Sequence, residues 1–417
     1  MGEPAEVELP VLTAPADGVP VVVDDEQARQ DCLAALAAGE GPVAVDVERA
    51  QSYRYSAKAY LVQLRRAGSG THLIDPIAFE TEGSEVADLS TLYETIGSAE
   101  WIVHAATQDL PNLVQLGLRP NTLFDTELAG RLLGLPRVSL GAMVERYCGV
   151  RLLKEHAAVD WSIRPIPQDW LAYAALDVEL LGELRDSLAA DLAEAGKQEW
   201  AVQEFDWLCR WAVQEHPTRP DAWRRTSGMH QVHHPRGLAV VRELWLTRDE
   251  IARTSDRAPS KIVPDKAITE LAGLVTRQDP QVPSPGELRN VIGFKRRSAR
   301  AHQDAWLAAL ERVAKIPNSQ LPPRRVAGNG IPAPRSWEKA KPEAAQRWNL
   351  VRPAVVELAE ELSVPVENLV SPDVLRHLLW QPTEPITIDG ITSQLVELGA
   401  RRWQIDLITP VVLDKLS

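Results

Sequence analysis

The chain has 417 residues, of which 45% are hydrophobic, and its formal net charge is -13. A chain of this length can bury a large core and is expected to divide into two or three domains. The negative charge argues against a protein that coats nucleic acid non-specifically, because neutralising phosphates requires concentrated Lys and Arg; a local basic surface is still compatible with it.

The cysteines and the start of the chain indicate a cellular compartment. Cys32, Cys148 and Cys209 are widely spaced and form no CxxC motif, so neither a disulfide framework nor a zinc site is predicted. Residues 1–18 are acidic and rich in proline, which is typical of a disordered segment and unlike a secretory signal. No stretch reaches the roughly 18 apolar residues of a membrane span. We therefore expect a soluble, cytoplasmic protein without membrane contact.

The first part of the chain alternates strand and helix patterns. Residues 19–25 predict a strand, residues 26–39 a helix closed by Gly39, and residues 42–48 a further strand. Residues 59–75 contain two apolar runs around a Gly-Ser-Gly turn, which predicts a hairpin. The sequence therefore predicts a mixed sheet.

The following segments read as mostly helical. A helix is predicted over residues 88–101, a short buried strand over residues 101–106, and a helix beginning near Asp109 that tolerates Pro111 in its first turn. Further helices are predicted over residues 122–134, 139–149 and 170–196. Early strands and late helices describe an α/β layered domain that ends near residue 200.

The rest of the chain is predicted to be helical. Residues 250–272 share Ala, Pro and apolar positions with residues 357–380, which indicates two copies of one small helical module. A stretch rich in Pro, Arg and Gly predicts an extended linker between them. The predicted divisions are a disordered start (1–18), an α/β domain (19–203), a first helical domain (204–318), a linker (319–338) and a second helical domain (339–417).

Four acidic residues lie in apolar stretches that should form regular elements: Asp46, Glu48, Asp109 and Asp177. A bare carboxylate in such a setting is costly unless a cation compensates for it. Asp46 and Glu48 share one face of a strand, and Asp177 follows Tyr173 by one helical turn. Asp109 begins a helix, whose dipole favours a negative charge.

Each of these positions also has an ordinary interpretation, as a solvated strand edge, a helix face or a helix cap. Together they indicate an oxygen-rich site for Mg²⁺ or Mn²⁺. Two such ions can activate a water and stabilise the leaving oxygen of an in-line phosphoryl displacement, with Tyr173 orienting the attacking water.

The motifs around these carboxylates resemble the three exonuclease motifs of ribonuclease D, in the DEDD superfamily of 3′-to-5′ exonucleases. They are VAVDVE with YLVQL, HAATQDL with FDTELAGRLLG, and KEHAAVDWSIRPIP with YAALDVELL. The spacing of Tyr173 and Asp177 is similar to that of the tyrosine subgroup. The resemblance covers most of residues 20–200. It implies an RNase H-like fold, a mixed sheet flanked by helices, with two divalent metal ions and release of nucleoside 5′-monophosphates from a 3′ end.

The resemblance also implies residue roles. Asp46, Glu48, Asp109 and Asp177 would be metal ligands, and Tyr173 would hold the nucleophilic water. Three residues of the second motif would support the site: His104, Gln108 and Asp125. A helix cap or helix hydrogen bond remains open for Asp125, and a core position is the default for His104.

Residues before the third motif are candidates for nucleic-acid binding. Lys154, Trp161 and Arg164 are expected to meet phosphate and base by charge and stacking, with a salt bridge inside the loop as the alternative.

The residue after the first-motif glutamate departs from the family pattern. Many relatives carry an aromatic or bulky apolar residue there, whereas this chain has Arg49. Stacking on the terminal base is therefore expected to be weaker, or to come from Tyr53 or Tyr55.

Residues 230–274, with residues 289–302 after them, resemble the HRDC module, a small all-α bundle that helps to hold nucleic acid. The local basic candidates are Lys261, Lys266, Lys295, Arg296, Arg297 and Arg300. A solvated helix face is the alternative for any single one of them. The second copy has fewer basic residues and is expected to pack against the first domain, with Trp380 and Trp403 in its core.

The leading functional hypothesis is a monomeric, metal-dependent 3′-to-5′ exoribonuclease that acts on RNA with a short single-stranded 3′ tail, such as a tRNA precursor. A 3′-to-5′ DNA exonuclease in repair shares every catalytic residue, but the chain has no polymerase region and no GxxxxGK[ST] motif. A catalytically silent nucleic-acid-binding scaffold is the third hypothesis. The presence of all five motif side chains argues against it.

Overall fold

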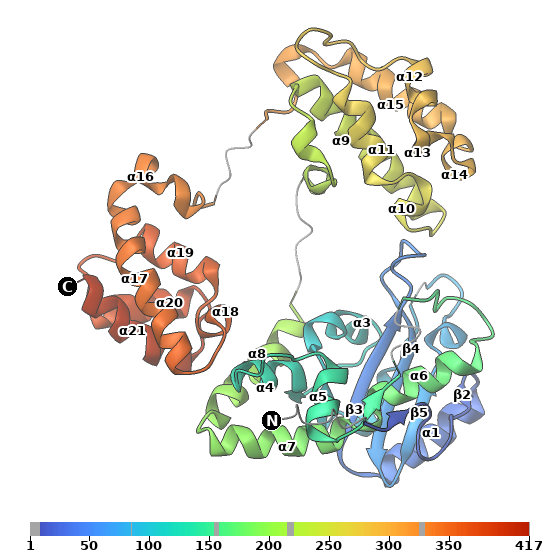
Figure 1. The fold of residues 1–417 in the computed structure, drawn as a ribbon. Coiled ribbons are helices and arrows are strands. Elements are labelled where there is room, and N and C mark those ends of the chain that lie inside the picture. Colours follow the sequence, from blue (N-terminus) through green and yellow to red (C-terminus); the bar gives the residue numbers. More distant parts are fainter. Residues whose placement is uncertain (1–8, 85, 154–157, 215–220, 325–329, 417) are drawn as a thin grey trace, which may run out of the picture.

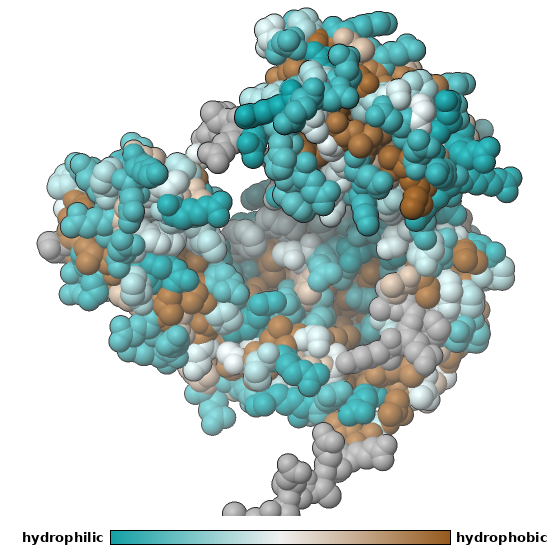
Figure 2. Space-filling view, turned by 45° about the horizontal axis from the view of Figure 1, so that its top comes forward, coloured by the Kyte–Doolittle hydropathy of each residue, from teal (hydrophilic) through white to brown (hydrophobic). Residues whose placement is uncertain are grey.

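The computed structural model describes residues 9–84, 86–153, 158–214, 221–324 and 330–416 (Figure 1). It contains an α/β domain followed by two helical domains. Figure 2 shows a recess between these bodies, while hydrophilic residues predominate on the visible faces of both helical domains. Among the described helices, none is both long and apolar enough to cross a bilayer.

The α/β domain is built on a six-stranded sheet with the order β2-β5-β4-β3-β6-β7. Its strands are β2 (Val22–Val23), β3 (Glu40–Arg49), β4 (Ala59–Ala67), β5 (Gly70–Ile74), β6 (Glu100–Val103) and β7 (Thr122–Asp125). β3, β4 and β5 are antiparallel, and the other pairs are parallel, which confirms the predicted mixed sheet. β3 is central, and its Val43, Val45 and Val47 are buried.

Helices flank this sheet. They are α1 (Glu26–Ala38), α2 (Ser90–Ile96), α3 (Leu110–Gln115), α4 (Thr126–Leu132), α5 (Leu140–Tyr147), α6 (Gln168–Glu179), α7 (Leu181–Glu194) and α8 (Gln198–Ala212). A separate two-residue pair joins β1 (Val11–Leu12) to β8 (Arg151–Leu152). The predicted helix after residue 26 is confirmed: Asp25 caps α1 and Gly39 ends it.

Two predicted helices are wrong in part. Residues 122–125 form β7, because this short apolar run pairs with β6 before Asp125 caps the helix that follows. The long helix predicted over residues 170–196 is broken at Leu180, whose backbone leaves helical geometry. The break lets α7 bury Leu181, Leu184 and Leu188.

The boundary predicted after residue 203 falls inside α8. This helix packs on β7, where Phe205 lies 4.9 Å from Phe124 between ring centroids. Its buried residues belong to the same apolar core as the sheet. The α/β domain therefore extends through Ala212.

The first helical domain contains α9 (Pro235–Thr254), α10 (Pro259–Ile262), α11 (Asp265–Gly273), α12 (Pro285–Asn290), α13 (Ile292–Lys295), α14 (Arg297–Arg300) and α15 (Gln303–Lys315). It has an apolar core of its own, in which Leu244, Ile268 and Trp306 are buried. Within the described residues, Tyr55 is the one hydrophobic side chain of the α/β domain that packs on this core.

The second helical domain contains α16 (Trp337–Ala340), α17 (Pro342–Glu361), α18 (Val366–Leu369), α19 (Pro372–Trp380), α20 (Ile388–Glu397) and α21 (Arg402–Leu416). Its buried residues form one continuous apolar core with those of the α/β domain. Trp403 of α21 stacks on Trp200 of α8, with ring centroids 4.8 Å apart. The expectation that this domain packs against the first domain is confirmed.

The internal similarity also has a structural counterpart. In both copies a long helix (α9, α17) is followed by a single-turn helix and a nine-residue helix. Two residues after the end of each long helix lies a residue with a left-handed backbone, Asp256 (φ 43°) in the first copy and Ser363 (φ 50°) in the second. The next N–H bonds a carbonyl five residues back, Arg257 to Ala252 and Val364 to Ala359. We call this Schellman-type turn the left-handed corner of each copy.

Candidate active site

Three of the four predicted carboxylates converge on one point. Asp46 and Glu48 extend from β3, and Asp177 extends from α6, which packs across β3, β4 and β5. One oxygen from each carboxylate lies within 4.8 Å of the others. All three side chains are half-buried. The two-residue strand period and the position of α6 therefore bring these three carboxylates together, while the fourth predicted member, Asp109, is outside this group.

Asp109 approaches from another side, just before α3, and is 4% exposed. Its side chain does not cap this six-residue helix. Instead, its Oδ1 lies 3.3 Å from Nη2 of Arg49, which also donates to the backbone carbonyl of Gln108. Burial, followed by the charge of Asp46, raises the pKa of Asp109 well above its usual range. The stabilisation expected from the helix dipole is thus outweighed.

The other three carboxylates of the predicted site also have raised pKa values. Burial raises the pKa of Asp46 to about 6. Burial raises the pKa values of Glu48 and Asp177 well above the usual range, and the charge of Asp46 adds to both shifts. Clustered carboxylate oxygens are the ligands that hard divalent cations prefer, and such a cation relieves this repulsion. The donor set therefore fits a divalent ion between Asp46, Glu48 and Asp177.

Tyr173 lies one turn before Asp177 on α6 and hydrogen-bonds to it. Burial, together with the charges of Asp177, Glu48 and Asp46, raises the pKa of the Tyr173 phenol far above its ordinary value. The phenol therefore stays protonated at neutral pH. Its hydroxyl donates to Asp177, and its oxygen can accept a further hydrogen bond beside the carboxylates.

A cavity of about 190 Å³ opens beside Glu48. Its lining consists of Val47, Glu48, Arg49, Gln51, Ser52, Ala158 and Val159. One wall is thus the chain that follows β3, and the opposite wall belongs to the segment before α6. The Tyr53 hydroxyl donates to the carbonyl of Ala158 at 3.3 Å and links the two walls.

Asp125 supports the site through the backbone. Its carboxylate caps α4 by accepting from the Leu128 N–H (3.1 Å). It also accepts from the N–H groups of Ala105 (3.1 Å) and Ala106 (2.8 Å), in the turn that leads to Asp109. Its predicted capping role is confirmed, and the additional bonds fix the second-motif turn.

His104 and Gln108 do not act in the same way. The Nδ1 of His104 lies 2.9 Å from Thr126 Oγ1, and burial lowers the pKa of this imidazole to about 4, so it is neutral and packed in the domain. The side chain of Gln108 is exposed, and its backbone carbonyl receives Arg49. The default interpretation of His104 as a core residue is the one that the structure shows.

One predicted nucleic-acid contact is wrong, and a second residue has a protein partner. Trp161 is 0% exposed and packs between Trp170 and Tyr173, so it cannot stack on a base. Arg164 is exposed. It pairs with Asp75, a partner outside its own loop, at 2.7 Å and donates to the Tyr60 carbonyl at 2.8 Å, and its contact with nucleic acid stays a prediction. Lys154 lies outside the described residues.

The aromatic residues after the first motif are also committed elsewhere. Tyr55 packs on the core of the first helical domain, so the expectation that it stacks on a terminal base is wrong. Lys261 Nζ lies 4.7 Å from the ring centroid of Tyr53 and covers that ring.

The structure also gives Arg49 a role that the sequence had marked only as a departure from the family pattern. Its guanidinium is the cation paired with Asp109. The sequence feature that could have indicated this role was a basic residue directly after the Asp46 and Glu48 pair.

The predicted basic cluster of the first helical domain is exposed. It comprises Lys295, Arg296, Arg297 and Arg300. Lys295 and Arg300 border a cavity of about 340 Å³ whose lining includes Phe294 and Trp306. Contact between this cluster and nucleic acid remains a prediction.

Comparisons with known proteins agree with this arrangement. Residues 20–193 match a family model described as 3′-5′ exonuclease, residues 237–310 match the HRDC domain, and residues 330–416 match a 3′ to 5′ exonuclease C-terminal domain. The second helical region, which was predicted to be HRDC-like, matches this C-terminal domain model and not the HRDC model.

Relatives match over most of the chain. Ribonuclease D of Acidiphilium cryptum is 31% identical over 341 residues, which is 79% of each chain. A crystal structure of a protein from Bifidobacterium adolescentis has a TM-score of 0.86 and 35% identity, covering 98% of this chain and 100% of that chain. Escherichia coli RNase D has a TM-score of 0.63 and 24% identity, covering 90% and 98%. The chain therefore belongs to the ribonuclease D family, with a 3′-to-5′ exonuclease domain followed by an HRDC domain and by the helical C-terminal domain of such exonucleases.

Proposed function

We propose that this ribonuclease D-type exoribonuclease shortens RNAs that carry a single-stranded 3′ tail, releasing nucleoside 5′-monophosphates one at a time. The observation that carries the proposal is the convergence of Asp46, Glu48 and Asp177 within 4.8 Å, one helical turn from Tyr173. Buried carboxylates without cations are destabilising, so the cluster is best explained by the ions that it would hold.

The residues divide the chemistry between them. Asp46, Glu48 and Asp177 would hold one divalent ion, and Asp46 with Asp109 would hold a second. When bound, such ions lower the pKa of the attacking water and stabilise the leaving oxygen. The Tyr173 phenol, whose hydroxyl donates to Asp177, would orient the attacking water by accepting a hydrogen bond from it. Arg49 compensates the charge of Asp109 and fixes the second-motif turn through the Gln108 carbonyl.

The substrate class is inferred from the helical domain and from a structural neighbour. The neighbour from Escherichia coli is described as an exoribonuclease involved in structured RNA processing. The exposed Lys295, Arg296 and Arg297 of this chain offer charge for a phosphate backbone. We propose precursors of tRNA or other stable RNAs as substrates, with the protein acting as a monomer.

One assay tests reaction polarity, sugar choice and the metal requirement together. Duplexes with a short 3′ tail, made of RNA or DNA and labelled at the 3′ end or internally, are incubated with Mg²⁺, with Mn²⁺ or with EDTA. We expect monophosphates from the 3′ label first, faster from RNA, and none in EDTA. Faster release from DNA would favour the repair-exonuclease alternative, and RNA binding without release would favour the scaffold.

A substitution assigns the activity to the site. Asp177→Asn should lower the rate by on the order of 10³-fold, equivalent to about 4 kcal/mol of transition-state stabilisation. It should also weaken Mn²⁺ binding measured by calorimetry. Glu183→Gln, at an exposed acid on α7, is the matched control and should change neither. An Asp177→Asn protein that trims RNA at the normal rate would contradict the assignment.

A further inference from the structure

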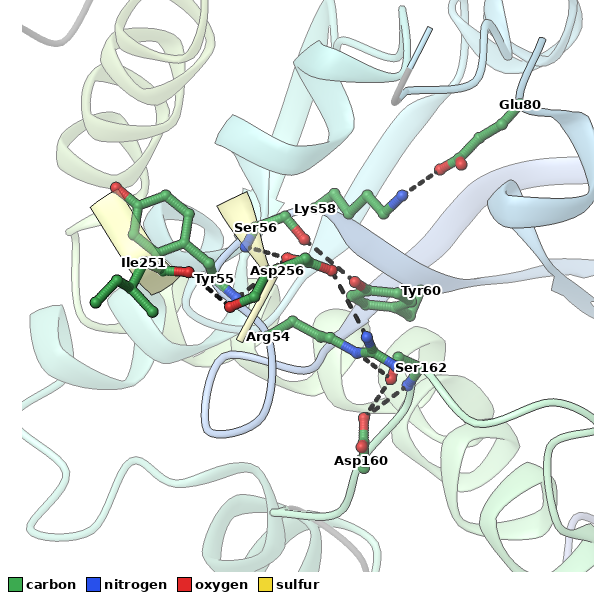
Figure 3. A network of polar contacts seen from close by, with 11 residues as sticks. Arg54, Tyr55, Ser56, Lys58, Tyr60, Glu80, Asp160, Ser162, Ile251 and Asp256 are labelled. Atoms are coloured by element: carbon green, nitrogen blue, oxygen red, sulfur yellow. Dashed lines mark hydrogen bonds and ion pairs between the residues drawn. The ribbon is translucent and has the colours of Figure 1, made fainter. Parts of the chain in front are cut away.

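The loop that follows the catalytic strand is held by the first helical domain (Figure 3). We call residues 50–58, between β3 and β4, the first-motif loop. The carboxylate Oδ1 of Asp256 accepts from two successive N–H groups of this loop, Tyr55 at 3.2 Å and Ser56 at 2.9 Å. Its Oδ2 lies 3.9 Å from Nη1 of Arg54. One side chain of the helical domain therefore fixes three consecutive loop residues.

Neighbouring contacts strengthen this attachment. The Tyr55 hydroxyl donates to the carboxylate of Asp249, with the shorter distance 3.1 Å. The Ala258 N–H donates to the Tyr53 carbonyl at 2.9 Å. The Asp256 and Ala258 contacts come from the left-handed corner, so this corner is the centre of the junction.

The same loop is bonded on its other side to the segment before α6. Arg54 Nε donates to Ser162 Oγ at 2.7 Å, and Ser162 in turn donates to Asp160 (Figure 3). Gln51 and Ser52 line the cavity beside Glu48. The contact of Asp256 with the first-motif loop is thus connected, through hydrogen-bonded groups, to the wall of the cavity beside Glu48, which we call the cleft.

We infer that Asp256 is a positioning residue of the exonuclease: it holds the first-motif loop and thereby sets the cleft wall that receives the 3′ end. The HRDC-type domain then acts on the reaction through protein contact, in addition to any contact with nucleic acid. The kinetic part of this inference rests on the proposed function, whereas the structural part does not.

The second copy provides an independent comparison, because its left-handed corner also docks on the α/β domain. The carbonyls of Leu362 and Ser363 accept from Nζ of Lys197 at 2.7 and 3.3 Å. A Cβ placed at Gly134 would lie 2.4 Å from the Ser363 carbonyl oxygen, so the corner sits directly on that backbone. The corner is therefore used twice for docking, and in the first copy the side chain of Asp256 reaches the catalytic loop.

The left-handed backbone of Asp256 allows matched variants. Asp256→Gly tolerates this φ but removes the carboxylate, so it tests the hydrogen bonds without backbone strain. Asp256→Asn also tolerates the left-handed region and keeps an oxygen that accepts from both N–H groups. Glu270→Gln, at an exposed acid on α11, controls for lost charge.

Hydrogen exchange of the full-length protein tests the contact itself. In Asp256→Gly we expect the Tyr55 and Ser56 amides to exchange at least tenfold faster than in the wild type. Asp256→Asn should restore most of the protection, and Glu270→Gln should not change it. Unchanged protection in Asp256→Gly would overturn the inference, whatever the substrate of the enzyme is.

Kinetics on 3′-tailed RNA test the positioning role. Asp256→Gly should raise KM about tenfold while kcat stays within twofold, and Asp256→Asn should return KM to nearly the wild-type value. Faster exchange with unchanged KM would overturn the link to the cleft, and a loss of Mn²⁺ affinity would show damage to the carboxylate site instead. If the wild type released no monophosphate, the proposed function would fail, while the exchange result would still decide the contact.

Discussion

The two helical modules share a fold segment and dock through the same corner, yet they are joined to the exonuclease domain in different ways. The second module continues the apolar core of the sheet domain, and Trp403 stacks on α8. The first module keeps its own core and attaches mainly through polar groups around Asp256 and Tyr55. One module is thus a permanent part of the nuclease body, and the other is a separate body placed beside the cleft.

The buried polar groups reinforce this difference. Glu204 of α8 is 4% exposed and accepts from Arg401 Nε at 2.7 Å and from Trp403 Nε1 at 2.9 Å. An ion pair with these additional hydrogen bonds, set in an apolar surface, fixes a single register between two bodies. At the junction of the first module, by contrast, Asp256 and Arg54 are partly exposed, and their charged atoms are separated by a longer distance of 3.9 Å. Exposed pairs of this kind contribute little to stability.

Removing a core tryptophan from each module should give the largest effect, and it tests whether the two modules unfold separately. Trp403→Ala should cost about 3–5 kcal/mol. The loss should appear in the unfolding transition shared by the exonuclease domain and the second module. Trp306→Ala, a similarly buried change, should lower the transition of the first module alone. Thermal unfolding followed by calorimetry distinguishes them, and a single transition lowered equally by both would contradict the division.

Metal ions should act on the same shared transition. At a concentration of Mn²⁺ about 100 times Kd, we expect about 2.7 kcal/mol of added stability. Without metal the stability should fall as the pH rises from about 4 to above 6. The sign follows because the folded protein keeps protons on Asp46, whose pKa is raised to about 6, while the unfolded chain releases them at lower pH. Unfolding scans in EDTA at pH 5 and 7.5 check this, and a first-module transition that followed the metal would contradict it.

Lys197 offers a more local test of the second junction. Lys197→Met removes the ammonium that donates to the carbonyls of Leu132 and Leu362, both at 2.7 Å, and leaves these oxygens without that donor. We expect a loss of about 1–3 kcal/mol from the shared transition in urea unfolding. Lys315→Met, at an exposed position on α15, is the control. Equal shifts from the two substitutions would argue against a specific role for Lys197.

The smallest effect is expected at the first junction. Tyr55→Phe keeps the ring in the core of the first module but loses the bond to Asp249. We expect a change of about 1 kcal/mol, confined to the first-module transition. Tyr93→Phe, which loses a bond to Asn121 away from both modules, is the matched control. A larger change in the shared transition than in that of the first module would reverse our assignment.

The sequence predicted what local periodicity determines. The two-residue period of β3 and the helical spacing of Tyr173 and Asp177 were sufficient to foresee a shared carboxylate face. The hairpin of β4 and β5 followed from its Gly-Ser-Gly turn. In contrast, β7 has only four residues before a helix begins, too few to display an alternating pattern.

Tertiary contacts decided the rest. Trp161 has the residue type of a base-stacking contact, but the packing around α6 buries it. Arg164 pairs with Asp75, which lies 89 positions earlier in the chain. The role of Asp256 depends on a left-handed backbone at a non-glycine residue and on a loop some 200 positions earlier in the chain. No pattern within a short window encodes such a partner.

The shared core of the α/β domain and the second module has a consequence for biosynthesis. A ribosome that has just completed α8 must still translate the whole first helical domain before it reaches Trp403, the residue that covers Trp200. At elongation rates of about 5–20 residues per second this interval lasts roughly ten to forty seconds. During this interval the middle domain can fold, because its core is its own. An apolar face of α8 meanwhile stays exposed to solvent and accessible to chaperones. The nuclease body is therefore completed only after the middle domain has been synthesised, when α21 emerges.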